Sequence, residues 1–65
     1  MNRNIRFILK SGEFITSSFK GTEIQNIFSI ICDKSNEDKW LDITNNGLKV
    51  GMIRVSQIEA AAVID

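Results

Sequence analysis

The sequence predicts a small α+β domain, in which a curled antiparallel sheet of about five strands packs against one helix in the order β-β-α-β-β-β. Most of the chain consists of short runs of alternating or β-branched apolar residues, separated by turns that contain glycine, serine or asparagine. One stretch alone, residues 22–34, has helical periodicity. The chain of 65 residues makes a single domain, and its short connections favour antiparallel neighbours.

The first two strands are predicted at residues 4–10 and 13–19, joined by a turn at Ser11-Gly12. The first strand alternates, with Ile5, Phe7 and Leu9 on one side. The second strand has apolar residues on both sides, and we expect it to be partly covered on both. The three phenylalanines of this hairpin are interpreted as core residues: Phe7, Phe14 and Phe19.

The helix is predicted over residues 22–34. Thr22 is the expected N-cap, and Gln25, three residues later, completes a capping box. Cys32, near the end of the helix, is expected to be a partly buried and unreactive small hydrophobe, because the helix C-terminus disfavours a thiolate. The apolar stripe of the helix consists of Ile24, Ile27, Phe28 and Ile31.

Two further strands are predicted at residues 39–44 and 48–55. The Asn46-Gly47 dipeptide between them suits a type I′ turn, in which both central residues have positive φ. Gly51 lies inside the second of these strands, which indicates a bulge or a bend.

The last segment, residues 58–64, fits two structures. Ser56 and Glu59 form a possible capping box, and the alanines that follow favour a helix. The alternation of residues favours a strand, and we prefer the strand because a helix here would be short and would have a poor apolar stripe. The four apolar residues expected on one face of this strand are Ile58, Ala60, Ala62 and Ile64.

The strands taken together resemble the small SH3-like or Sm-like barrels. The resemblance lies in a bent meander followed by a short turn, here Ser56-Gln57, before the final strand. The chain departs from that pattern because its helix lies between the second and third strands and not at a terminus. The resemblance concerns the order of the strands, and it implies no function.

Composition restricts the class of function. The chain has eight basic and eight acidic residues, so no overall field attracts nucleic acid or an anionic membrane. One cysteine and no histidine exclude an internal disulfide and the usual structural zinc site. The first residues do not form a signal peptide, and no apolar run could span a bilayer, so we expect a cytoplasmic protein.

No constellation of residues predicts catalysis or a cofactor. The acids at Asp33, Glu37, Asp38 and Asp42 do not have the spacing of a calcium loop, and lysines lie among them. The four glycines are dispersed and do not form a phosphate-binding loop. We therefore expect a non-enzymatic protein with no metal ion and no cofactor.

The helix predicts self-association. Its apolar residues, with Ile30 included, cover about half of its circumference or more, which is a wider arc than one thin sheet needs. The surface that covers the surplus is either the outer strands of the same domain or a second copy. Trp40 is the only tryptophan, a residue favoured at interface hot spots and also suited to the core of a small domain. The predicted function is a homo-oligomeric accessory or regulatory module, of the kind that phages and other mobile elements encode, and its predicted protein-interaction residues are Ile27, Ile30 and Trp40.

The alternative function is binding of RNA or single-stranded DNA by a small barrel. Small barrels bind single strands by stacking bases on aromatic rings that lie beside basic groups. The first hairpin contains such a mixture of phenylalanine and basic residues. The residues predicted to contact nucleic acid in this alternative are Arg3, Arg6, Lys10 and Lys20.

Overall fold

A computed structural model describes all residues, 1–65, and confirms the α+β class and the predicted order of elements. Helix α1 covers Ile24–Cys32, and single turns of 3₁₀ helix lie at Gly21–Glu23, Lys34–Asn36 and Val55–Gln57. The strands are β1 (Asn2–Leu9), β2 (Phe14–Lys20), β3 (Trp40–Asn45), β4 (Leu48–Arg54) and β5 (Ile58–Val63).

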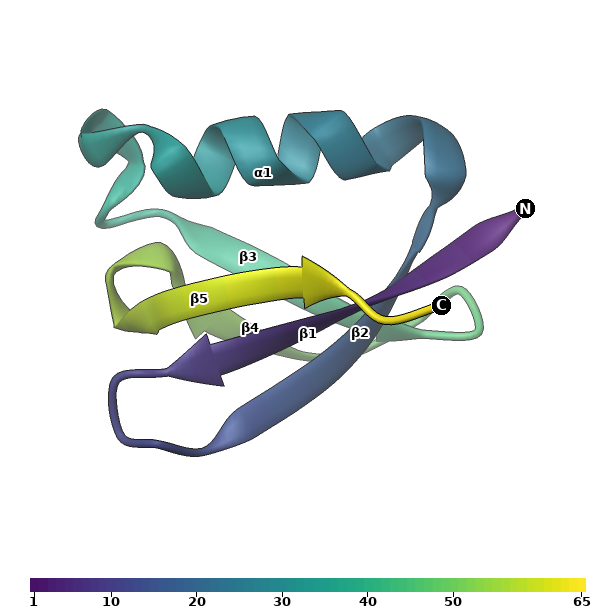
Figure 1. Cartoon of the computed structure of the whole chain (residues 1–65), viewed down its shortest axis with the longest axis horizontal. Helices are drawn as coiled ribbons and strands as arrows, with labels where there is room; N and C mark the ends of the chain where they lie inside the picture. The colour runs from purple at the N-terminus through teal and green to yellow at the C-terminus, as the bar shows by residue number, and fades with distance from the viewer.

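The strands form two antiparallel sheets that do not close into a barrel. One sheet has the order β2-β1-β5, and the other is the β3-β4 hairpin. In Figure 1 the first sheet lies in front of the second, and α1 lies above both. The core fills the space between these three layers. It consists of nine buried apolar residues: Ile5, Phe7, Phe19, Ile27, Leu41, Ile43, Ile53, Val55 and Ile58.

The first hairpin follows its predicted alternation. Ile5 and Phe7 are fully buried, and Phe19 packs edge-on against Phe7 with 6.2 Å between ring centroids. The prediction for Phe14 is wrong, because this residue faces outward and is 63% exposed. Phe14 lies on the face of β2 that points away from α1 and β3, and no other element of the chain covers that face.

The helix begins differently from the prediction. The chain enters α1 through the 3₁₀ turn Gly21–Glu23, and the Gly21 N–H donates to the Met1 carbonyl at 2.8 Å. The Glu23 carboxylate accepts the Lys20 backbone N–H at 3.1 Å. The predicted capping box of Thr22 and Gln25 is therefore wrong, since the cap lies at the start of the 3₁₀ turn, two residues earlier.

We expect Glu23→Ala to destabilise the chain by about 1 kcal/mol, because it removes the acceptor of an otherwise unpaired N–H at a helix start. Thr22→Ala, one residue earlier, should change the free energy of unfolding by less than about 0.5 kcal/mol. Urea unfolding followed by circular dichroism measures both variants. A larger loss of stability in Thr22→Ala than in Glu23→Ala would show that Thr22 is the cap.

The 3₁₀ turn after α1 is capped by Asp33. Its carboxylate accepts the Ser35 backbone N–H at 2.9 Å and the Ser35 hydroxyl at 2.8 Å. These hydrogen bonds from Ser35, with a smaller contribution from the charge of Lys39, lower the pKa of Asp33 below its ordinary value of 3.8. Because the folded pKa is lowered, the stabilisation is complete above the ordinary pKa and is lost as pH falls through the folded one.

The carboxyl carbon of Asp33 should therefore titrate below 3.8 in an NMR pH series of the folded chain. In Ser35→Ala the hydrogen bond from the hydroxyl is lost, while the one from the backbone N–H remains. The titration midpoint of Asp33 should therefore rise only part of the way to 3.8. A midpoint at or above 3.8 in the unmodified chain would show that the Ser35 bonds do not form in solution.

The second hairpin confirms the predicted turn. Asn46 has φ of 53° and Gly47 has φ of 80°, the left-handed pair that a type I′ turn requires. The predicted irregularity near Gly51 is also present. Ile43 lies opposite Gly51, whereas Thr44 lies opposite Lys49, so Val50 is the extra residue of a bulge.

The last segment is a strand, so the helical alternative is wrong. Its face assignment is corrected by a second bulge. Leu9 lies opposite Ile58 and Ile8 lies opposite Ala60, which leaves Glu59 without a partner. The extra residue shifts the alternation, so the half-buried residues after it are Ala61 and Val63. The predicted continuous face is therefore wrong for three exposed residues, Ala60, Ala62 and Ile64.

Candidate functional site

Side-chain hydrogen bonds join the two sheets between β2 and β3. The Ser17 side chain is 1% exposed, and its hydroxyl accepts the Thr44 backbone N–H at 2.9 Å. The Ser18 hydroxyl donates to the Thr44 carbonyl at 3.3 Å, and the Thr44 hydroxyl donates to the Ser18 carbonyl. Side-chain hydroxyls therefore replace a backbone ladder at the point where the two strands cross.

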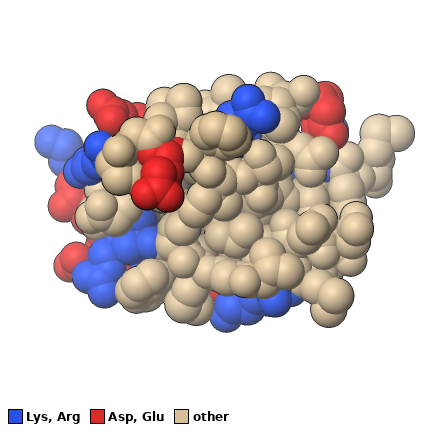
Figure 2. All heavy atoms as spheres, turned by 90° about the horizontal axis from the view of Figure 1, so that it is seen from below, with Lys and Arg blue, Asp and Glu red and all other residues tan.

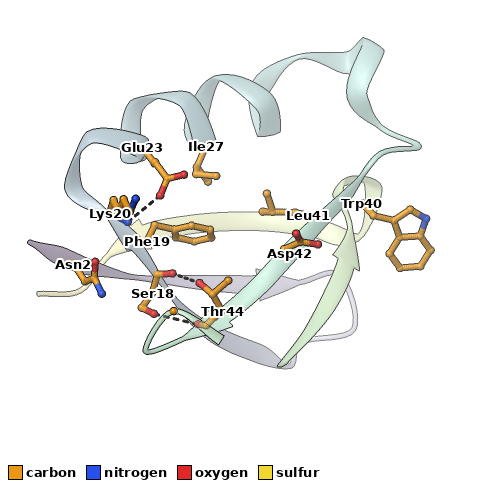
Figure 3. A pocket seen from close by; sticks show the side chains of 11 residues that line it. Asn2, Ser18, Phe19, Lys20, Glu23, Ile27, Trp40, Leu41, Asp42 and Thr44 are labelled. Atoms are coloured by element: carbon orange, nitrogen blue, oxygen red, sulfur yellow. Dashed lines mark hydrogen bonds between the residues drawn. The ribbon is translucent and has the colours of Figure 1, made fainter. Parts of the chain in front are cut away.

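A groove of about 480 Å³ opens beyond this junction, between β2, β3 and α1. Figure 3 shows Phe19, Ile27 and Leu41 pointing into it from three different elements. Lys20, Glu23 and Asp42 are among the polar residues of its lining, and Glu23 is already bonded to the Lys20 backbone. The hydroxyls of Ser18 and Thr44, which also line the groove, donate to each other's backbone carbonyls.

Trp40 lies between two hollows of the surface. It lines the groove described above and also a second cavity of about 480 Å³ beside Leu9, Ile53 and Gln57. Its side chain is 53% exposed, and the Arg54 guanidinium lies 4.8 Å from its ring centroid. Figure 3 shows the indole projecting away from the body of the chain. This predicted interaction residue is therefore accessible to a partner.

The two helix residues predicted for interaction are covered by their own chain. Ile27 is 6% exposed and belongs to the core, which corrects its assignment to an interaction surface. Ile30 is half-buried and packs against the same core. The reason is that α1 lies over two sheets and not one, as Figure 1 shows, so a wide apolar arc is covered. The helix alone thus gives no argument for self-association.

Exposed apolar residues that the sequence patterns did not predict lie on β4. Leu48, Val50 and Met52 are 70%, 63% and 46% exposed. Ile53, next to Met52, is the one buried residue of β4. The bulge at Val50 shifts the alternation, so Lys49 lies on the face of Met52, where it pairs with Asp42 at 3.2 Å, and Leu48 lies on the opposite face. The alternation of the sequence therefore did not predict these faces.

A second apolar row crosses the outer face of the other sheet. Phe14, Ile8 and Ala60 are cross-strand neighbours, and all three are exposed. The Arg6 guanidinium lies 4.8 Å from the Phe14 ring centroid and covers part of it. Figure 2 shows few charges across the middle of the side opposite α1, with most charged side chains toward its rim.

The four basic residues of the nucleic-acid alternative are not brought together. Arg3 and Lys20 lie at one end of the β1-β2 hairpin, and Lys10 lies in the turn at its other end. Roughly 20 Å of extended strand separates Arg3 from Lys10. Arg3 donates to the Asp65 carbonyl at 2.8 Å, and Arg6 stacks on Phe14. These residues therefore form no continuous basic surface.

The other residues considered for chemistry are Cys32 and the acidic side chains. Cys32 is exposed, which corrects its predicted partial burial. No three side chains among cysteine, aspartate and glutamate converge as metal ligands would. None of the helical segments is long and apolar enough to cross a bilayer.

Comparison of the chain with protein-family models, with curated proteins and with solved structures finds no match.

Proposed function

We propose that this chain is a small, non-catalytic protein-interaction module that associates with itself, and that it serves as an accessory or regulatory protein in the cytoplasm. The observation that supports this proposal is the exposure of three large apolar residues on β4, Leu48, Val50 and Met52. They lie on a strand that pairs on one side only, with β3.

An exposed apolar strand with an unpaired edge is a ready site for pairing with another chain, and proteins that remain monomeric usually block such strands. Only ten of the 65 residues are buried, so the core is thin and further burial through association has a large relative effect. The accessible Trp40, on the neighbouring strand, extends the same surface.

Sedimentation equilibrium tests the proposal. At micromolar to about 100 μM concentration, the unmodified chain should exceed its monomer mass of 7.3 kDa. Val50→Glu places a charge among the exposed apolar residues of β4 and should weaken association at least tenfold, or by about 1.4 kcal/mol. Thr16→Glu, at an exposed polar position of the other sheet, is the control and should leave the mass unchanged. A monomeric unmodified chain over the whole range would contradict the proposal.

A further inference from the structure

The turn that joins β3 to β4 holds two groups that can react with each other. Asn46 and Gly47 are its central residues, and both are exposed at the outer end of the hairpin (Figure 1). The Asn46 side-chain amide makes no hydrogen bond. The Gly47 N–H takes part in no backbone hydrogen bond, and nothing lies within 4 Å of the point where a Cβ on Gly47 would stand. Both groups are therefore free and open to solvent.

The side-chain carbonyl carbon of an asparagine is an electrophile within reach of the backbone nitrogen of the next residue. In this reaction the Gly47 nitrogen gives its proton to solvent and forms a bond to Cγ of Asn46. The Cγ–Nδ2 bond breaks, and the side-chain nitrogen leaves as ammonia. Water then opens the resulting five-membered ring at one of its two carbonyl carbons. The product is aspartate, or isoaspartate with the main chain running through Cβ and Cγ, and no oxidant or reductant is needed.

Asn46 is the one asparagine of the chain that precedes a glycine. The other five precede residues with a side chain, and they are Asn2, Asn4, Asn26, Asn36 and Asn45. A side chain on the following residue crowds the attacking nitrogen, whereas glycine has no Cβ and leaves that nitrogen accessible. The reaction is therefore expected to select Asn46.

The folded turn holds the reacting atoms apart. The φ angles of Asn46 and Gly47 are 53° and 80°, as in a type I′ turn. The first central residue of such a turn has ψ of about +30°, which places the next nitrogen on the far side of the Cα–C bond from Cβ. Attack requires rotation about that bond, so the end of the hairpin must open first. Exposed loop ends open at little cost in free energy.

We propose that Asn46 is a site of spontaneous modification, and that its isoaspartate product keeps the end of the β3-β4 hairpin open. Isoaspartate adds one carbon atom to the main chain of a two-residue loop, whose length fixes the register of the strands. The nearest pairs are Asn45 with Leu48 and Thr44 with Lys49. Thr44 also donates its N–H to the Ser17 hydroxyl. The modification therefore loosens the junction of the two sheets as well as the hairpin, and it gives the folded chain a finite chemical lifetime.

Mass spectrometry of the chain after incubation at mildly alkaline pH tests the site. Trypsin cleaves after Lys39 and Lys49, so the fragment 40–49 carries Asn46 and separates it from every asparagine except Asn45. This fragment should gain the mass of an amide-to-acid change at least about tenfold faster than any fragment that carries Asn2, Asn4, Asn26 or Asn36. Asn46→Gln is the control, because it leaves Asn45 as the one asparagine of the fragment, and it should lower the rate to that of the other fragments. Equal rates in all fragments, or an unchanged rate in Asn46→Gln, would contradict the proposed site.

Amide hydrogen exchange tests the structural consequence. The isoaspartate form, separated by chromatography, is compared with freshly prepared Asn46→Asp, which has the same atoms and charge and a normal backbone. Exchange at Thr44 should be at least about tenfold faster in the isoaspartate form, with a smaller change at Phe7 in the other sheet. Equal exchange at Thr44 in the two chains would show that the hairpin closes around the modified residue. Neither measurement depends on association, so a monomeric chain would remove the proposed function and leave this inference standing.

Discussion

Phe7→Ala is expected to leave the chain largely unfolded at 25 °C. Phe7 is fully buried at the centre of β1 and contacts Phe19 edge-on. Truncation of a buried phenylalanine costs about 3–5 kcal/mol, through lost transfer free energy and the cavity that remains. A domain of this size has a total stability of roughly 3–10 kcal/mol. The substitution therefore removes most of the free-energy difference between the folded and unfolded states.

Thermal unfolding and urea unfolding, followed by circular dichroism, measure this effect. Ile8→Ala is the matched control, because Ile8 adjoins Phe7 on the same strand and faces outward with 43% of its side chain exposed. Its cost should stay below about 1 kcal/mol at concentrations where the chain is monomeric. Equal losses from both substitutions would show that β1 does not have one buried face in solution.

Ser17→Ala is expected to cost about 1–3 kcal/mol, although it removes a single oxygen. The Ser17 hydroxyl is the acceptor of the Thr44 N–H at the junction of the two sheets. Without this hydroxyl the part-buried Thr44 amide has no hydrogen-bond partner. The uncompensated desolvation of that amide destabilises the folded state. Because no backbone ladder joins β2 to β3 beside this contact, the two sheets should also separate more readily.

Two measurements distinguish this role from simple packing. The free energy of unfolding of Ser17→Ala is compared with that of Thr16→Ala, an exposed neighbour for which less than about 0.5 kcal/mol is expected. Amide hydrogen exchange should then accelerate at Thr44 in Ser17→Ala by a larger factor than at Phe7 in the centre of β1. Unchanged exchange at Thr44 would mean that water or another group replaces the hydroxyl.

Local patterns predicted those parts of the fold that local chemistry decides. The alternation around Ile5 and Phe7 predicted a half-buried strand, and Asn46-Gly47 predicted the turn that the structure has. Both follow from the properties of neighbouring residues, such as side-chain direction and tolerance of positive φ. The class and the order of elements follow from several such patterns taken together.

Features decided by pairing between distant segments were not predictable in the same way. The bulge at Glu59 exists because β5 must fit against β1, and it reversed the expected faces of the alanines. The cover over Ile30 depends on α1 lying across two sheets. Thr22 matched a capping pattern, yet the cap lies at the start of an earlier 3₁₀ turn, at Lys20, whose N–H donates to the Glu23 carboxylate. The exposure of Leu48, Val50 and Met52 on β4 could not be predicted from alternation, since Lys49 and Gly51 between them are also exposed and the bulge at Val50 shifts the faces.

Both strands with an uncovered edge contain a bulge, at Val50 in β4 and at Glu59 in β5. Bulges increase the right-handed twist of a strand and bend it locally. Amyloid fibrils need flat, identical strands that stack without limit at a repeat of about 4.8 Å. The two bulges therefore oppose fibril growth from the same edges that are open to pairing. A concentrated solution of this chain is expected to remain free of thioflavin-positive material.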